Sequence, residues 1–513
     1  MVTLTLPGSV ASIQDRRYSH IRVENACAGT TRWCRIPKHF HLVRFASFVV
    51  AACGRAWNSA SLTTWLSLSV RILGMAILMP LVLAKLPIAQ ANVWLLLTSI
   101  ASLQLMADFG FSPTFVRAVS YAGASRVSGE ATSLHAPLYQ IVETMRRVYL
   151  RLLVVAVLGL GLVGTYVLLK PIGFLNDPIV GWIAWAVTLS GGGISFRKGM
   201  YSAFLQGLDK IAIVRRTEAI SDLLGLLFAI VCLLLGGGLI SVVASAQGGY
   251  AIAYVVLRRQ ALRADTGVVW SGKTTNHPVV MNFVWPAAWR SGLGTIMSFG
   301  VFQGLGMGYA QVATPSQSTS FLLALRLSRM LTVFSNVPFY VKVPSMARAY
   351  AEGSVPQLIS MAGRGMFLTM WLVCGGVILI GFSAPWLLQV IGSEAAFVPG
   401  TVWWLISFGM ILERAGAMHL QLFSMTNEIV WHIANGVAGA IVIVGSLLLI
   451  KPFGAYGVAL SYMLSNIMFY APYCMTRSYT RFGLSFKDID LNALLLPLIF
   501  ISVILAVSVM MSS

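Results

Sequence analysis

The chain has 513 residues, of which 57% are hydrophobic and 10% are charged, and its formal net charge is +20. Soluble domains carry about 25% charged residues, so this composition excludes a soluble enzyme or a soluble binding domain. Together with a mean hydropathy of +0.80, it indicates a protein that lies within a lipid bilayer.

Thirteen apolar segments follow one another along the chain, and each has about the 20 residues that a helix needs to cross the hydrocarbon core. They are approximately 62–84, 91–118, 149–169, 178–205, 217–235, 239–257, 284–308, 318–341, 366–391, 397–424, 429–450, 454–475 and 492–511. A spanning strand would instead show about 10 residues of alternating hydrophobicity. All thirteen segments are therefore predicted to be transmembrane helices.

The basic residues between these segments are distributed unevenly. Twenty-five Lys and Arg residues lie in the connections on one side, 1–61, 119–151, 206–216, 258–283, 342–365 and 476–491. Only Lys85, Lys170 and Lys451 lie on the other side. Cytoplasmic connections carry the excess of Lys and Arg, so we expect a cytoplasmic N-terminus and a C-terminus outside. The positive charge therefore indicates topology and not a nucleic-acid partner.

The two halves of the chain resemble one another. The polar stretch 206–211 after the fourth span corresponds to 424–429 after the tenth, and Arg71 in the first span corresponds to Arg290 in the seventh. Six spans per half give both halves the same orientation, with a substrate site expected at their interface. The predicted parts are a basic cytoplasmic N-terminal segment (1–61), a first six-helix bundle (62–258), a cytoplasmic linker (259–283), a second six-helix bundle (284–475), and a cytoplasmic loop with an extra transmembrane helix (476–513).

Several motifs resemble those of one transporter family in their order and spacing. The first hairpin contains Trp94 and Ala107-Asp108-Phe109-Gly110-Phe111-Ser112, followed by Arg117. Leu205-Gln206-Gly207-Leu208-Asp209-Lys210 follows the fourth span, and Lys451-Pro452-Phe453-Gly454-Ala455-Tyr456-Gly457 precedes the twelfth. These motifs resemble Wzx-type polysaccharide flippases of the multidrug/oligosaccharidyl-lipid/polysaccharide exporter superfamily, over residues 62–475.

The resemblance implies an all-α polytopic protein of the bacterial inner membrane. Two six-helix bundles would form a V-shaped, MATE-like exporter fold, with one extra C-terminal transmembrane helix. The implied function is a flippase that moves an anionic, undecaprenyl-diphosphate-linked oligosaccharide across that membrane for exopolysaccharide or O-antigen biosynthesis, by ion-coupled alternating access. Membrane lipids and polysaccharide polymerase and co-polymerase proteins are the further implied partners. The odd number of spans and the long basic N-terminal segment depart from the family pattern.

Charged side chains inside the predicted spans carry the strongest functional signal. The basic ones are Arg71, Arg117, Arg197, Lys198, Arg290, Arg326, Arg329 and Arg414, and the acidic ones are Asp108, Asp222 and Glu413. A cation at the bilayer centre costs on the order of 3 kcal/mol, so such residues face a partner or a water-filled cavity. Eight cations against three acids predict a cationic cavity and an anionic ligand.

Arg326 and Arg329 are the principal substrate-binding candidates. They lie three positions apart on one face of the 318–341 span, roughly 12–17 Å from its outer end, and guanidinium groups suit bidentate contact with phosphate. Pairing with an acid or with carbonyl groups inside the bundle is the alternative. Arg71 and Arg290 are expected to face each other across the cavity mouth, and extension toward the headgroups is their alternative.

Glu413 is the first candidate for coupling transport to protons, because a carboxyl group buried in a membrane can exchange a proton near neutral pH. A static salt bridge is the competing interpretation. Asp108 is a second coupling candidate, although its Asp-x-Gly motif is more typical of a packing and turn element. No pair of cysteines shows metal-ligand spacing, and no GxxxxGK[ST] motif occurs in the sequence. We therefore predict no metal, no cofactor and no nucleotide-driven step.

Three other functions share parts of this pattern. A drug/cation antiporter of the same superfamily would need acids in its cavity. A peptidoglycan-precursor (lipid II) flippase would share the lipid-diphosphate site and differ at the sugar-facing surface. A membrane glycosyltransferase or polymerase would need catalytic residues on sizeable outer loops, whereas the outer connections here are short. We therefore do not expect an enzyme.

Overall fold

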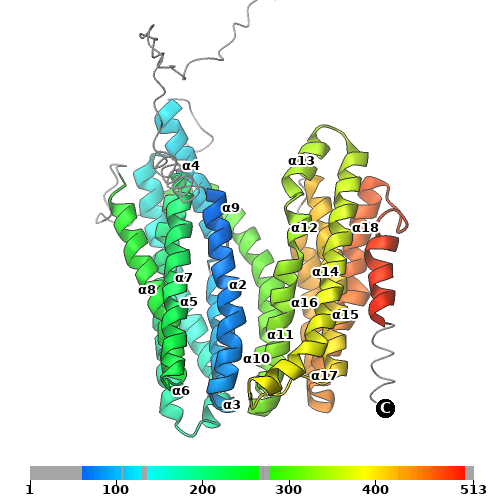
Figure 1. The fold of residues 1–513 in the computed structure, drawn as a ribbon. Helices are drawn as coiled ribbons and strands as arrows, with labels where there is room; N and C mark the ends of the chain where they lie inside the picture. The colour runs from blue at the N-terminus through cyan, green and yellow to red at the C-terminus, as the bar shows by residue number, and fades with distance from the viewer. Residues whose placement is uncertain are drawn as a thin grey trace, which may run out of the picture. The chain divides into compact units, whose positions relative to one another are not determined.

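In the computed structural model of the chain, the described residues are 60–106, 108–128, 136–264, 270, 277–426, 428 and 430–502. All regular elements within these ranges are helices (Figure 1). The predicted N-terminal segment 1–61 lies outside them except for its last two residues, and so does part of the predicted linker 259–283.

The N-terminal half (60–264) contains seven helices in the described ranges, coloured blue to green in Figure 1. They are α2 (Ala60–Lys85), α3 (Ile88–Met106), α4 (Phe111–Ser128), α5 (Leu138–Gly173), α6 (Pro178–Gly207), α7 (Ile211–Leu234) and α8 (Leu239–Leu262). Within this half, α6 packs against α5 and α8, while α7 packs against α2 and α8.

The C-terminal half (277–502) is more often interrupted. Its elements are α9 (Pro278–Thr295), η1 (Ile296–Gly300), α10 (Val301–Ala310), α11 (Pro315–Ser335), α12 (Val337–Tyr340), α13 (Val343–Ala351), α14 (Val355–Val390), α15 (Gly400–Phe423), η2 (Ser424–Thr426), α16 (Trp431–Phe453), α17 (Ala455–Ser465), η3 (Asn466–Tyr470), α18 (Ala471–Phe482) and η4 (Leu491–Leu495). The apolar helix that contains η4 runs from Leu491 to Ser502. Here α15 packs against α17 and α18, while α14 packs against α11 to α13.

Within the described ranges, seven helices are long and apolar enough to cross a membrane: α2, α5, α6, α7, α8, α14 and α16. Where they are described, the other predicted spans coincide with helical segments that are short, interrupted or charged, such as α9 with η1 and α10. Residues 503–511 of the last predicted span lie outside the described residues. Two bounds differ clearly from prediction, because α5 and α14 each have 36 residues. The extra turns lie mainly at the N-terminal ends and are polar or mixed in sequence, so hydrophobicity missed the first eleven residues of each helix. The total of thirteen spans stays a prediction.

The two halves meet where α3 packs against α10 and α11, and where α4 packs against α9. Leu95, Leu96 and Leu97 of α3 are almost completely buried, and they share one apolar cluster with Leu322 and Leu323 of α11. Apolar contacts therefore hold α11, the helix that carries Arg326 and Arg329, against the other half of the chain.

A tight turn separates α3 from α4. Ser112 donates its backbone N–H to Asp108 Oδ2 at 2.9 Å, which caps the first turn of α4. Phe109 and Gly110 have positive φ angles of 49° and 71°. A Cβ on Gly292 of α9 would lie 2.7 Å from the Phe109 backbone, so glycine permits the close approach of this turn to α9. Asp108 thus has the turn role that its motif suggested.

Gly292→Ala is expected to destabilise the protein, because the new methyl group would meet backbone atoms of a packed turn. Overpacking of this kind typically costs about 1–3 kcal/mol, so the melting temperature of the detergent-purified protein should fall by several degrees. Gly294→Ala is the matched control on α9, since nothing lies within 4 Å of the added Cβ. Equal melting temperatures for the two variants would contradict the close approach.

Candidate substrate site

Arg326 lies at the contact between the two halves. Helix α11 begins with a capping box, in which Thr314 and Gln317 exchange hydrogen bonds, and Pro315 stands at its first position. About three turns later, Arg326 Nη2 donates a hydrogen bond to Thr98 Oγ1 of α3. Its guanidinium carbon lies 5.0 Å from the centre of the Trp94 ring, also on α3.

Arg326 therefore has neutral partners. Among the described residues, no carboxylate forms an ion pair with its guanidinium group, which is only partly exposed. A hydroxyl group and an aromatic face stabilise a cation much less than a carboxylate does. Within the described residues, the positive charge of Arg326 is thus not neutralised by a carboxylate.

Arg329 belongs to a second environment, which we call the C-half cluster: Arg329, Glu413, Arg414 and Tyr462. Glu413 accepts hydrogen bonds from Arg414 Nη2 and from the Tyr462 hydroxyl. Arg329 interacts electrostatically with Glu413, and its guanidinium carbon lies 5.9 Å from the Phe302 ring centre. The cluster has two guanidinium groups and one carboxylate, so it keeps a net positive charge.

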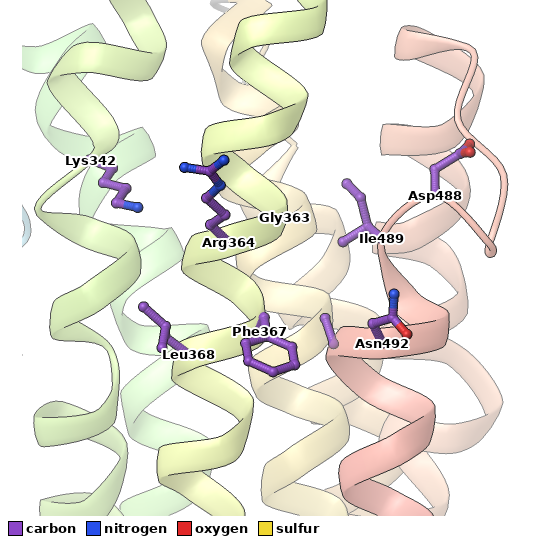
Figure 2. Close-up of a pocket in the computed structure, with 9 residues that line it drawn as sticks. Lys342, Gly363, Arg364, Phe367, Leu368, Asp488, Ile489 and Asn492 are labelled. Carbon is purple, nitrogen blue, oxygen red and sulfur yellow. The ribbon is translucent and has the colours of Figure 1, made fainter.

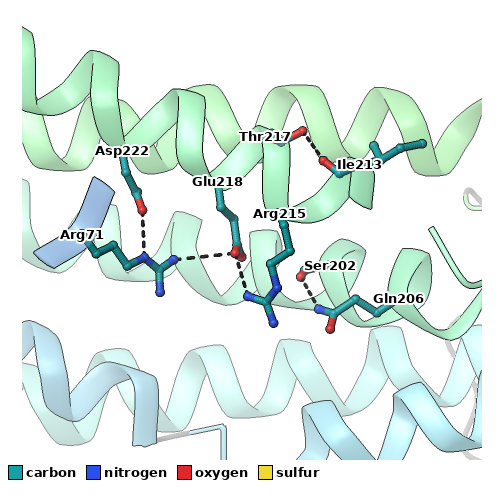
Figure 3. Close-up of polar contacts among 8 residues, drawn as sticks. All are labelled: Arg71, Ser202, Gln206, Ile213, Arg215, Thr217, Glu218 and Asp222. Atoms are coloured by element: carbon teal, nitrogen blue, oxygen red, sulfur yellow. Dashed lines mark hydrogen bonds and ion pairs between the residues drawn. The ribbon is translucent and has the colours of Figure 1, made fainter. Parts of the chain in front are cut away.

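Arg71 belongs to the N-half cluster, which comprises Arg71, Arg215, Glu218 and Asp222 (Figure 3). Lys198, which interacts electrostatically with all four, is its fifth member. Arg71 Nε donates to Asp222 Oδ2 at 2.9 Å, and its Nη2 lies 3.7 Å from Glu218 Oε2. Arg215 also pairs with Glu218, at 2.9 Å. With three cations and two carboxylates, this cluster is positive as well.

The expectation that Arg71 and Arg290 face each other across a cavity mouth stays a prediction. Arg71 is occupied by the two acids of α7, while Arg290 is exposed on α9, with its guanidinium carbon 5.8 Å from the Trp289 ring centre. Sequence reasoning gave no role to Glu218 and Asp222. Their spacing of four residues was the available signal, because it places both on one face of a helix.

Thr98 and Tyr462 are further residues of the site that sequence reasoning missed. Each is a polar side chain in an otherwise apolar helix, which is a weak signal because Ser, Thr and Tyr are common in membrane helices. Within the described ranges, no group of three or more His, Cys, Asp or Glu side chains is placed to hold a metal ion. Each of the two clusters contains one more cation than carboxylate.

No protein-family model and no curated relative matches this sequence. Solved structures do match. An inward-facing multidrug resistance MATE family transporter of the MOP superfamily aligns with a TM-score of 0.59 and 15% identity, over 82% of this chain and 98% of its own. The lipid II flippase MurJ, in an inward closed conformation, aligns with a TM-score of 0.59 and 13% identity, over 87% of this chain and 92% of its own.

The chain has the MOP transporter fold. A MOP superfamily transporter from Pyrococcus furiosus also aligns, with a TM-score of 0.51 and 16% identity, over 83% of this chain and 95% of its own. These matches confirm the predicted all-α, MATE-like fold, and with the apolar helices they indicate a multi-pass membrane protein. The MOP fold occurs both in a multidrug transporter and in a lipid flippase, so the fold alone does not distinguish these two functions. The charges of the site bear on the choice between them.

Proposed function

We propose that the chain is a flippase for undecaprenyl-diphosphate-linked oligosaccharides, which moves them from the cytoplasmic to the periplasmic leaflet of a bacterial inner membrane. The observation that carries this proposal is Arg326, a guanidinium group without a carboxylate partner among the described residues, at the contact between the two halves. Alternating access exposes such an interface first to one side and then to the other. A diphosphate matches both the charge and the fork geometry of arginine.

The charge balance favours this substrate over a cationic drug. The N-half and C-half clusters each contain one more cation than carboxylate, and Arg326 adds a further positive charge. A drug/cation antiporter needs the opposite balance. The MOP transporter from Pyrococcus furiosus is described as having a reversed pocket polarity that suggests a different function, so pocket polarity is a meaningful distinction within this fold.

Energy for transport would come from an ion gradient. Glu413 remains the first carboxylate to test for coupling, because it lies within reach of two guanidinium groups and a tyrosine hydroxyl. Asp108 is the weaker candidate, since its carboxylate already caps α4. Polysaccharide polymerase and co-polymerase proteins would act on the product, and we propose them as partners on that basis.

The proposal is tested with the purified full chain in liposomes. Fluorescent undecaprenyl-diphosphate oligosaccharide, lipid II and a cationic dye would be offered separately, and flipping would be scored by accessibility to a membrane-impermeant quencher. We expect flipping of the oligosaccharide lipid and no transport of the dye. Transport of lipid II alone would establish the peptidoglycan-precursor alternative, and transport of the dye alone would establish the antiporter.

The topology that this direction of transport requires is also testable. Reporter fusions after Arg259 and after Ser513 are expected to read cytoplasmic and periplasmic, because 25 basic residues lie in the connections on one side and three on the other. A fusion after Lys170 should read periplasmic and serves as the internal reference. Reports from the same compartment for Arg259 and Ser513 would overturn the count of thirteen spans.

A further inference from the structure

A pocket of about 460 Å³ lies beside the C-terminal helix (Leu491–Ser502), and none of the residues that line it belongs to the clusters described above (Figure 2). One wall comes from Lys342, between α12 and α13, and from the N-terminal part of α14. The other comes from the loop before η4 and from η4 itself. Arg364 and Phe367 line it from α14, and Ile489 and Asn492 line it from the opposite wall. The pocket therefore exists only when the C-terminal helix lies against α14.

Two cations dominate the pocket. Lys342 and Arg364 extend toward the same space in Figure 2, and neither forms an ion pair with another described residue. Asp488 also lines the pocket, but its Oδ2 accepts hydrogen bonds from Ser485 N at 2.6 Å and from Ser485 Oγ at 2.9 Å. These bonds lower the pKa of the Asp488 carboxyl group. Asp488 is therefore bonded within its own loop, and the two cations are left for an anion.

An apolar surface descends from these charges along α14. Phe367 and Leu368 are 40% and 48% exposed. The ring of Phe367 lies 6.1 Å from that of Trp371, which lies 5.6 Å from that of Phe500 on the C-terminal helix. Cations at one end and a row of aromatic rings below them match the two ends of a lipid, a phosphate headgroup and its hydrocarbon chains.

The depth of the pocket agrees with this match. Arg364 precedes Val390, the last residue of α14, by 26 positions, or roughly 39 Å of helix. The hydrocarbon core is about 30 Å thick. If Val390 lies at one boundary of the core, Arg364 lies beyond the other, among the headgroups on the side that carries the basic connections.

The C-terminal helix is held in place by a buried contact. Asp490, two residues before Asn492, lies 3.0 Å from His419 Nε2 of α15, and it also accepts a hydrogen bond from the Tyr479 hydroxyl. Asp490 and His419 are both almost fully buried. This contact fixes the wall of the pocket that Ile489 and Asn492 form.

We propose that this pocket binds a lipid phosphate group of the cytoplasmic leaflet, with Lys342 and Arg364 at the phosphate and the hydrocarbon chains along Phe367, Trp371 and Phe500. Basic pockets between transmembrane helices on the cytoplasmic side are suited to anionic headgroups. A chain with twelve spans would lack the extra C-terminal helix. The role of this helix is then to complete a lipid site. The proposal holds whether or not the chain transports a lipid-linked glycan.

Native mass spectrometry of the detergent-purified full chain tests the proposal. Phosphatidylglycerol, phosphatidylcholine, undecaprenyl diphosphate and inorganic phosphate would be titrated separately. We expect Lys342→Ala/Arg364→Ala to weaken binding of an anionic lipid at least tenfold. Arg348→Ala/Lys487→Ala removes the same charge from exposed positions in α13 and in the loop before η4, and should bind like the wild type. Arg364→Glu is a second variant. Because position 364 is exposed, the new carboxylate is not buried and the protein should fold normally.

The lipids distinguish the source of the phosphate. Preference for phosphatidylglycerol assigns the pocket to a resident membrane lipid, and preference for undecaprenyl diphosphate assigns it to a lipid-linked substrate; both outcomes support the proposal. Binding of inorganic phosphate as strong as that of the lipids would overturn it in favour of a free-anion site. Equal lipid binding by the pocket variant and the surface variant would overturn it as well.

Discussion

Arg326→Ala abolishes transport of the lipid-linked glycan while the protein stays inserted at normal abundance: this is the result that the environment of Arg326 predicts. Its partners are Thr98 and Trp94, both uncharged, so its removal strands no buried carboxylate. Losing a hydrogen bond to a charged group costs about 1.5–3 kcal/mol of folding free energy. Part of this cost is offset, because the alanine variant no longer has to remove a cation from water when it folds. Binding of the diphosphate should suffer more than folding.

Complementation of a deletion strain, with membrane abundance measured in parallel, checks this result. Arg326→Lys should restore transport only in part, because an ammonium group lacks the bidentate fork. Arg197→Ala removes an exposed arginine from α6 and is the matched control, with transport expected to stay normal. Normal transport by Arg326→Ala would refute the anion site. Disappearance of the variant from the membrane would show that the role of Arg326 is structural.

Glu413→Gln is expected to have the second largest effect, and the property that it changes first is the stability of the protein. The substitution leaves Arg414, a residue that is only 8% exposed, and Arg329 without the carboxylate that they share. Removing one partner of a buried ion pair typically costs about 3–5 kcal/mol, so the melting temperature of the purified protein should fall strongly. If Glu413 also couples transport to protons, the surviving protein should flip its substrate independently of the pH gradient.

A double-mutant cycle separates these effects. Glu413→Gln/Arg414→Met removes both charges and should recover much of the stability that Glu413→Gln loses. Glu352→Gln, at an exposed position after α13, is the control for loss of a carboxylate and should change neither property. An unchanged melting temperature in Glu413→Gln would contradict the buried pair. An unchanged response to the pH gradient would remove Glu413 from the coupling mechanism.

The sequence by itself determined the class of the protein. Hydrophobicity and segment length are local properties, so the helical segments and the positions of most connections could be predicted without coordinates. The MATE-like fold was implied by the resemblance of several motifs to a known transporter family. Charge composition is equally local, and the surplus of cations over acids was countable from the start. Pairs within one helix, such as Arg215 with Glu218, also follow from spacing, because residues three apart share a helix face.

Only the tertiary structure decided which charges are compensated. Arg71 and Asp222 are 151 positions apart, and Arg326 and Thr98 are 228 positions apart. Such contacts depend on which helices are neighbours and on how each is rotated about its axis, and side-chain packing sets both. The same arginine in an apolar segment can thus meet two carboxylates, as Arg71 does, or a hydroxyl group and an aromatic ring, as Arg326 does. The local sequence around the two is similar, and the neighbouring helix makes the difference.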